Sequence, residues 1–154
     1  MVEDLCETQV QNLKNLNLQE MIEKVKRYGG KNNCFLELER FNNMSEALNC
    51  LTAERIAECL FDYSYYILND RFPAAEPLIA RKPEVAYLYA KKIIGDRFPE
   101  AEPIIAEDFF FSYFYAVDVI KGRFYEGEFS IKNSKSDAKY VYVKKFDCPE
   151  ILED

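Results

Sequence analysis

The sequence predicts an all-α fold, an array of short helix pairs with an N-terminal helical cap. A unit of 26 residues recurs in the second half of the chain, and apolar residues recur at helical spacing. The one short alternating segment has no second segment with which to form a sheet. We therefore expect a cap over residues 1–50, a repeat array over 51–146 and an acidic tail over 147–154.

The cap begins with two amphipathic helices. Apolar residues on one face predict a helix over 3–14. Asn17 and Glu20 form a capping-box pair ahead of a second apolar stripe, and Gly29 is the first of two glycines that stop it. The second helix is therefore expected over 18–28.

The segment 31–43 is the least regular part of the cap. Its alternation is compatible with a short strand, but an isolated strand is unstable, so a loop or helical turn is favoured. Ser45 is placed to cap a short helix over 46–51. Thr52 is placed to cap a long helix over 53–68.

Three copies of the repeat occupy 63–80, 89–106 and 115–131, and a partial fourth copy at 140–146 is one residue out of step. Three positions keep a spacing of 26 residues throughout: Tyr63, Tyr89 and Tyr115; Arg71, Arg97 and Arg123; Glu76, Glu102 and Glu128. Each unit is expected to form a longer helix, a tight break and a shorter helix, and such arrays generally bind other molecules rather than catalyse.

The breaks follow from glycine and proline chemistry. Gly95 and Gly122 suit the left-handed conformation that ends a helix, and Asn69 is the usual substitute. Pro73 and Pro99 suit the start of the shorter helix, because proline in the first turn loses no hydrogen bond.

The remaining boundaries are the starts of the long helices and the end of the chain. Pro83 and Asp108 mark the beginnings of the next long helices. The final eight residues, 147–154, contain four acids and no base, and they are expected to fray.

Composition restricts the function more than it identifies it. The net charge is −7, which argues against direct nucleic-acid binding and permits a basic protein partner. The chain has no histidine, no phosphate-binding glycine motif and no metal-ligand spacing, so we expect no enzyme, catalytic residue, metal or cofactor. No apolar run approaches the roughly 18 residues of a membrane span. Five unpatterned cysteines and an acidic N-terminus without an apolar stretch indicate a cytoplasmic protein with reduced thiols.

Two residue sets are candidates for a functional surface. The regular charges Arg71, Arg97, Arg123, Glu76, Glu102 and Glu128 would either form a ladder facing a partner or join each break to the next helix; the structural role is favoured. The second set, expected to bind a partner, comprises Phe109, Phe110, Phe111, Tyr113, Glu100, Glu107, Asp108 and Glu126. Its aromatics surround one helix, so they are either sandwiched between helices or partly exposed. Its acids would either imitate a phosphate backbone or form an ordinary solvated face.

The unit at 89–106 resembles the tandem repeat of a group of bacteriophage and giant-virus proteins, in which Tyr-Ala…Gly-Arg-Phe/Trp-Pro-Glu-Ala-Glu recurs. The resemblance covers about residues 53–146, and Tyr125, Gly127 and Phe129 depart from it, as in a terminal capping repeat. It implies a viral protein acting in the host cytoplasm.

We therefore expect a non-enzymatic inhibitor of a host protein, in its sharpest form an anti-CRISPR-like protein that occupies a nucleic-acid-binding defence complex. Two alternatives stay open. In the first, the repeat arginines hold the phosphates of a nucleotide or other small ligand while the tyrosines stack on its base. In the second, the protein serves in the structure or assembly of a virion.

Overall fold

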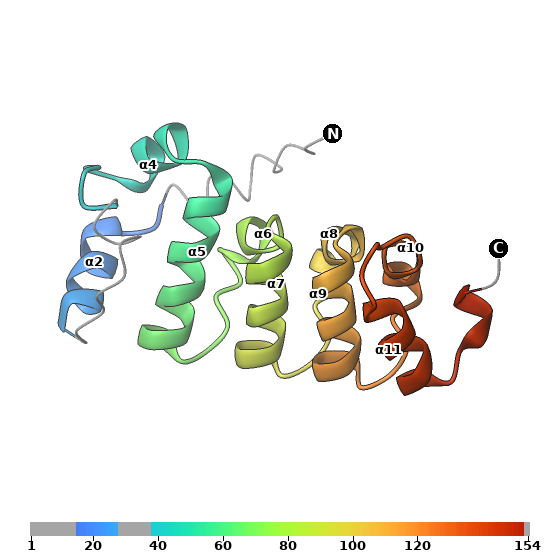
Figure 1. Ribbon diagram of the computed structural model, residues 1–154. Helices are drawn as coiled ribbons and strands as arrows, with labels where there is room; N and C mark the ends of the chain where they lie inside the picture. Colours follow the sequence, from blue (N-terminus) through green and yellow to red (C-terminus); the bar gives the residue numbers. More distant parts are fainter. Residues whose placement is uncertain (1–14, 28–37, 153–154) are drawn as a thin grey trace. The chain divides into compact units, whose positions relative to one another are not determined.

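The computed structural model describes residues 15–27 and 38–152, and within these ranges the secondary structure is helical, which confirms the all-α fold (Figure 1). The chain divides into two compact units, residues 1–81 and 82–154, which are considered separately. The helix expected over 3–14 and most of the alternating segment lie outside the described residues. Leu38, within that segment, is helical and buried.

The elements of the first unit are α2 (Leu18–Arg27), α4 (Met44–Cys50), α5 (Ala53–Tyr63), the π-helix η1 (Ser64–Leu68) and α6 (Glu76–Ile79). The Asn17 side chain accepts the Glu20 N–H at 3.1 Å, as the capping box requires. Thr52 caps α5 as predicted. The predicted Ser45 cap is wrong, because Asn43 caps α4 by accepting the Glu46 N–H at 2.9 Å.

The second unit alternates longer and shorter helices. Its elements are α7 (Pro83–Tyr89), η2 (Ala90–Ile94), η3 (Pro99–Ala101), α8 (Glu102–Glu107), α9 (Phe109–Phe114), η4 (Tyr115–Ile120), η5 (Tyr125–Gly127), α10 (Glu128–Lys132), α11 (Ala138–Phe146) and η6 (Pro149–Leu152). In Figure 1 α7, α9 and α11 lie side by side, with α8 and α10 near one end of them. Pro83 and Asp108 stand at the starts of α7 and α9, as predicted.

Each long helix ends on a residue in the left-handed conformation, and these residues are 26 apart. They are Asn69 (φ 49°), Gly95 (φ 73°), Lys121 (φ 57°) and Asp147 (φ 51°). The prediction is confirmed for Asn69 and Gly95 but wrong for Gly122, because Lys121 takes the left-handed position. The length of the helix fixes where the left-handed residue falls, and here it falls on Lys121. This conformation costs a non-glycine residue about 1–2 kcal/mol.

The last turn of the first three long helices is π-helical. This explains why the fourth copy is one residue out of step with the others. A π segment holds one more residue than the α turn that it replaces. Tyr63, Tyr89 and Tyr115 each lie six residues before the left-handed residue, whereas Tyr142 lies five before Asp147 because α11 has no π segment. The loop before α11 carries the compensating residue, since Glu128 and Tyr142 are 14 apart and Glu102 and Tyr115 are 13 apart.

The core of the second unit is built from repeat tyrosines and phenylalanines. Tyr89 packs on Phe98 with ring centroids 5.5 Å apart, and Tyr115 packs on Phe124 at 5.1 Å. All four side chains are at most 1% exposed. The same two repeat positions therefore supply a buried aromatic pair in successive copies.

The C-terminal segment is ordered over 147–152, and the prediction of fraying is wrong there. Pro149–Leu152 form a 3-10 helix, and Cys148 and Ile151 are buried. The segment packs because folding removes these two apolar side chains from water. Among the described cysteines, Cys50 and Cys148 carry free thiols.

The third copy differs from the second at two contacting positions, where one residue has become smaller and the other larger. A Cβ atom on Gly127 would lie 2.5 Å from the Ser112 hydroxyl oxygen and 2.6 Å from the Phe124 ring. The corresponding residues of the preceding copy are Ala101 and Ala86, both fully buried. Alanine opposite alanine has thus become glycine opposite serine.

Gly127→Ala should destabilise the protein by about 1–3 kcal/mol through overpacking. The double variant Gly127→Ala/Ser112→Ala, which restores the pair of the preceding copy, should recover part of this loss. Urea denaturation of the three proteins measures the coupling. Gly122→Ala is the control, because its nearest neighbour would be 3.7 Å from the new Cβ. A double variant less stable than Gly127→Ala would contradict the matched-pair interpretation.

Candidate functional site

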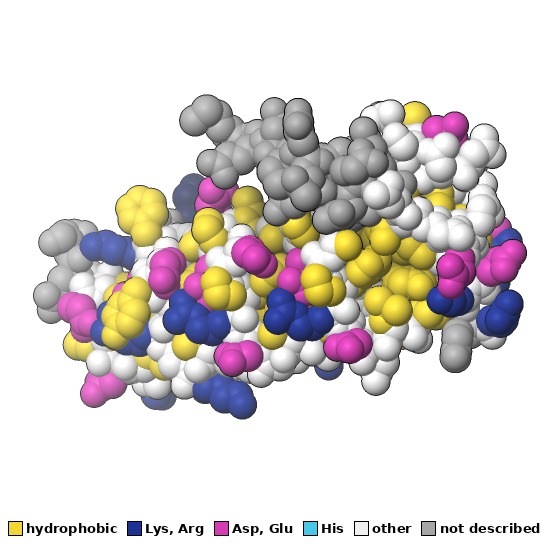
Figure 2. Space-filling view, turned by 180° about the vertical axis from the view of Figure 1, so that it is seen from behind, with side chains coloured by type: hydrophobic (Ala, Val, Ile, Leu, Met, Phe, Trp, Pro, Cys, Tyr) yellow, Lys and Arg dark blue, Asp and Glu magenta, His cyan; other side chains and the backbone are white. Residues whose placement is uncertain are grey.

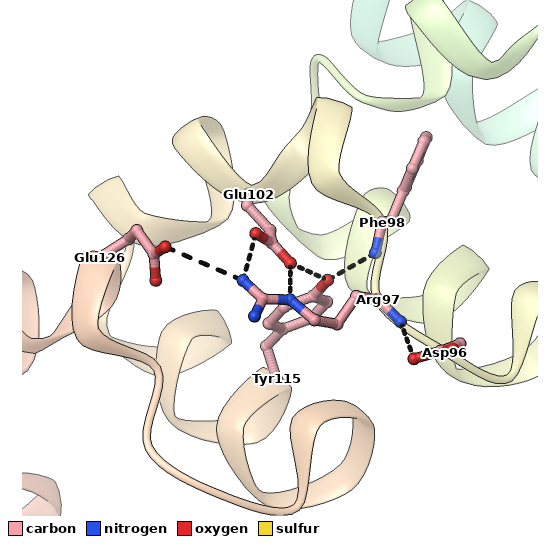
Figure 3. Close-up of polar contacts among 6 residues, drawn as sticks. All are labelled: Asp96, Arg97, Phe98, Glu102, Tyr115 and Glu126. Carbon is pink, nitrogen blue, oxygen red and sulfur yellow. Dashed lines mark hydrogen bonds and ion pairs between the residues drawn. The ribbon is translucent and has the colours of Figure 1, made fainter.

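The arginine and glutamate of each repeat form a bidentate ion pair rather than an exposed ladder. Arg97 donates from Nε and Nη2 to the two carboxylate oxygens of Glu102, at 2.7 and 2.6 Å (Figure 3). Tyr115, from the next long helix, donates its hydroxyl proton to Glu102 at 2.9 Å. The Phe98 N–H in turn donates to the Tyr115 hydroxyl oxygen at 2.6 Å. One buried carboxylate thus joins a break, a short helix and the following long helix.

The next copy repeats this network. Arg123 donates to Glu128 at 2.7 and 2.9 Å, Tyr142 donates to Glu128 at 3.1 Å, and the Phe124 N–H donates to Tyr142 at 2.9 Å. The slipped fourth copy therefore places its tyrosine in the same role.

In the first unit, Arg71 and Glu76 are paired in the same bidentate way, with both donor–acceptor distances 2.8 Å. The outer edges of the other two arginines also meet carboxylates. Arg97 lies 3.8 Å from Glu126, and Arg123 lies 2.5 Å from Glu150. These contacts support a structural role for the charged repeat positions.

The pKa shifts fit a network that stays charged at neutral pH. Burial alone would raise the pKa of Glu102, but the hydrogen bonds from Arg97 and Tyr115 outweigh it, and the net shift is downward. The pKa of Arg97 is raised, chiefly by its hydrogen bonds to Glu102. The pKa of Tyr115 is raised, chiefly by burial. The tyrosine therefore stays protonated and acts as a donor to the carboxylate.

The aromatic residues around α9 are mostly sandwiched between helices. The rings of Phe111 and Phe114 each lie 6.1 Å from that of Tyr87 on α7. Phe110, at 51% exposure, is the exposed member of the predicted aromatic set. The other three, Phe109, Phe111 and Tyr113, are half-buried. Packing thus accounts for most of this cluster, and Phe110 is the part that can meet a partner.

The predicted acidic set does not form one continuous surface. Glu100 and Glu107 are exposed. Asp108 caps α9 by accepting the Phe110 and Phe111 N–H groups at 2.8 and 3.1 Å, and Glu126 faces Arg97. Figure 2 shows acidic side chains interleaved with basic and hydrophobic ones on one face. Mimicry of a phosphate backbone therefore has little support in this arrangement.

Exposed hydrophobic residues near the C-terminus were missed by the sequence prediction. Tyr125 is 68% exposed, Phe129 78%, Tyr140 54% and Val141 52%. Tyr125 and Phe129 occupy the positions of the exposed Pro99 and Pro103 in the preceding copy. The Arg123 guanidinium carbon lies 4.8 Å from the centroid of the Tyr125 ring. The replacement of surface prolines by aromatics was the signal that could have identified them.

A hollow of about 440 Å³ in the first unit is bordered by two cations and two aliphatic side chains, Lys24, Arg27, Ile67 and Leu68. Lys24 also pairs with Glu20 at 2.6 Å. The hollow lies between α2 and η1, and its charges suit an anionic group. No repeat arginine borders it among the described residues.

Tyr115→Phe should lower the free energy of unfolding by about 1–3 kcal/mol, because the buried Phe98 N–H loses its acceptor and Glu102 loses a donor. Chemical denaturation measures the change. Tyr125→Phe is the matched control and should have little effect, since the Tyr125 side chain is exposed. Equal stability of the Tyr115→Phe variant and the wild type would contradict the role assigned to this hydroxyl.

The lowered pKa of Glu102 predicts a loss of stability in acid. Its stabilising contribution is complete above the ordinary glutamate pKa of 4.5 and is lost as the pH falls through the lower value of the folded state. Urea midpoints measured from neutral pH down to pH 3 should therefore fall less steeply for Glu102→Gln than for the wild type. Parallel curves would show that this carboxylate does not contribute.

Beyond these contacts, no group of three cysteine, aspartate or glutamate residues within 15–27 and 38–152 is arranged to hold a metal ion. The helices of the described ranges are too short or too polar to cross a bilayer. Comparison of the chain with protein-family models, curated proteins and solved structures gives no match.

Proposed function

We propose that this chain is a non-enzymatic protein-binding module, a viral inhibitor that occupies a host defence factor. The exposure of Tyr125 and Phe129 is the observation that carries the proposal. They lie four residues apart, and each has more than two thirds of its surface in solvent. Large aromatic side chains are the usual anchors of protein interfaces, and leaving two of them exposed is unfavourable unless a partner covers them.

Charge supports a partner that handles nucleic acid. The net charge of −7 is complementary to the basic clefts of such proteins and speeds association with them. The repeat arginines are paired with carboxylates, so they are poorly placed to bind a phosphate backbone. The viral resemblance of the repeat favours a host defence complex of the CRISPR type as the target.

The hollow beside α2 favours a second candidate function, binding of an anionic small molecule such as a nucleotide. The ligand would be held by Lys24 and Arg27 rather than by the repeat arginines first considered for this role. A thermal-shift screen with nucleotides and cyclic nucleotides tests it. A ligand whose stabilisation disappears in the Arg27→Glu variant would favour this function over protein binding.

Capture from bacterial lysate tests the protein-binding proposal. Immobilised wild-type chain should retain one dominant protein after nuclease treatment. Phe129→Asp should reduce its recovery at least about tenfold, which corresponds to roughly 1.4 kcal/mol. Tyr66→Asp is the matched control, because Tyr66 is an exposed aromatic of the first unit, at 60% exposure. Recovery that is unchanged by Phe129→Asp, or that disappears with nuclease, would contradict the proposal.

A further inference from the structure

The contact of α7 and its continuation η2 with α9 and its continuation η4 shows what the repeat recognises on a neighbouring helix. Tyr87 donates its hydroxyl proton to Asp118 at 2.5 Å, and Lys91 pairs with the same carboxylate at 2.8 Å. Lys91 also donates to the Tyr87 hydroxyl at 2.9 Å. The Tyr87 ring packs against Phe111 and Phe114. A tyrosine and a lysine one turn apart thus bind a helix with two aromatics and a carboxylate.

The spacing on the bound helix is specific. Phe111, Phe114 and Asp118 occupy positions i, i+3 and i+7. Phe111 and Phe114 share one face of α9, and Asp118 follows one turn later on its π-helical continuation η4. Burial alone would raise the pKa of Asp118, but its contacts with Lys91 and Tyr87 outweigh it and the net shift is downward. The carboxylate is therefore recognised in its charged form.

Helix α11 carries the same tyrosine–lysine pair. Tyr140 and Lys144 follow Tyr87 and Lys91 by 53 residues each and keep the separation of four. The register is fixed independently, because Tyr142 makes the hydrogen bonds in its network that Tyr115 makes in the preceding one. Tyr140 therefore corresponds to Tyr87, and Lys144, one α-helical turn after Tyr140, lies on the same face of α11.

This face of α11 is uncovered in the described part of the chain. Tyr140 is 54% exposed, whereas Tyr87 is 7% exposed. Lys144 is exposed and has no ion pair with a described carboxylate. Helix η6 packs on α11 but leaves the Tyr140 and Lys144 side chains exposed.

We propose that Tyr140 and Lys144 form a docking site for one helix of a partner protein, which presents aromatic residues at i and i+3 and an acidic residue at i+7. The docked helix carries an acidic residue because Lys139, Lys144 and Lys145 make α11 basic. A symmetric pairing of two α11 helices would bring these lysines together, which disfavours a second copy as the occupant. This inference rests on the proposed protein-binding function and names the chemistry of the partner.

The test uses the full chain and a labelled probe peptide, a soluble alanine-based helix of about 20 residues with Phe-x-x-Phe-x-x-x-Asp on one face. Fluorescence anisotropy should show saturable binding. Lys144→Glu should weaken it at least about tenfold, and a peptide with lysine in place of aspartate should bind this variant better than the wild type. Lys92→Glu, a charge reversal at an exposed lysine of η2, should leave binding unchanged.

Three results would overturn the proposal: no saturable binding, equal binding by the wild type and Lys144→Glu, or a concentration-dependent dimer that Tyr140→Ala abolishes. The last result would assign the face to a second copy of the chain. The titration uses purified components and residues outside the Tyr125–Phe129 pair. Its failure is therefore distinguishable from a failed capture through Phe129.

Discussion

The paired glutamate of each repeat, Glu102 and the less deeply buried Glu128, is the constraint on which the second unit depends. A carboxylate this far from water is unfavourable unless its oxygens are paired, and here the guanidinium of one break and the hydroxyl of the next long helix pair them. The same hydroxyl accepts a backbone N–H just after the break. One carboxylate therefore links the break, the short helix and the following long helix, and removing the tyrosine hydroxyl leaves the buried Phe98 N–H without its acceptor.

The fold class and the repeat positions were predictable because they depend on residue type and spacing. The pairing of Arg97 with Glu102 follows from their recurrence, and Pro83 and Asp108 start helices through local backbone chemistry. The left-handed residue at Lys121 was not predictable from composition, because helix length selects it against the preference of the neighbouring glycine. The choice of Asn43 over Ser45 as the N-cap of α4 was also not predictable, because asparagine and serine are both favourable N-cap residues.

The exposed surface was harder to predict than the core. Whether an aromatic side chain is covered depends on the helix beside it, and no single-helix pattern contains that information. Phe111 and Tyr140 illustrate the difference: both belong to aromatic-rich helices, yet the first packs on α7 and the second is 54% exposed. Comparison of equivalent positions between copies carries the missing information, because a residue type that changes at one repeat position marks a change of surroundings.

The π-helical turns bear on how such a chain tolerates changes in length. A helix that ends in a π turn can lose one residue by reverting to the α form, while its tyrosine and its left-handed end keep their contacts. Helix α11 shows the result, with the deleted residue balanced by an inserted one in the preceding loop. The helices of this chain can therefore absorb single-residue insertions and deletions, and an alignment of its copies that confined gaps to the loops would misplace the fourth copy.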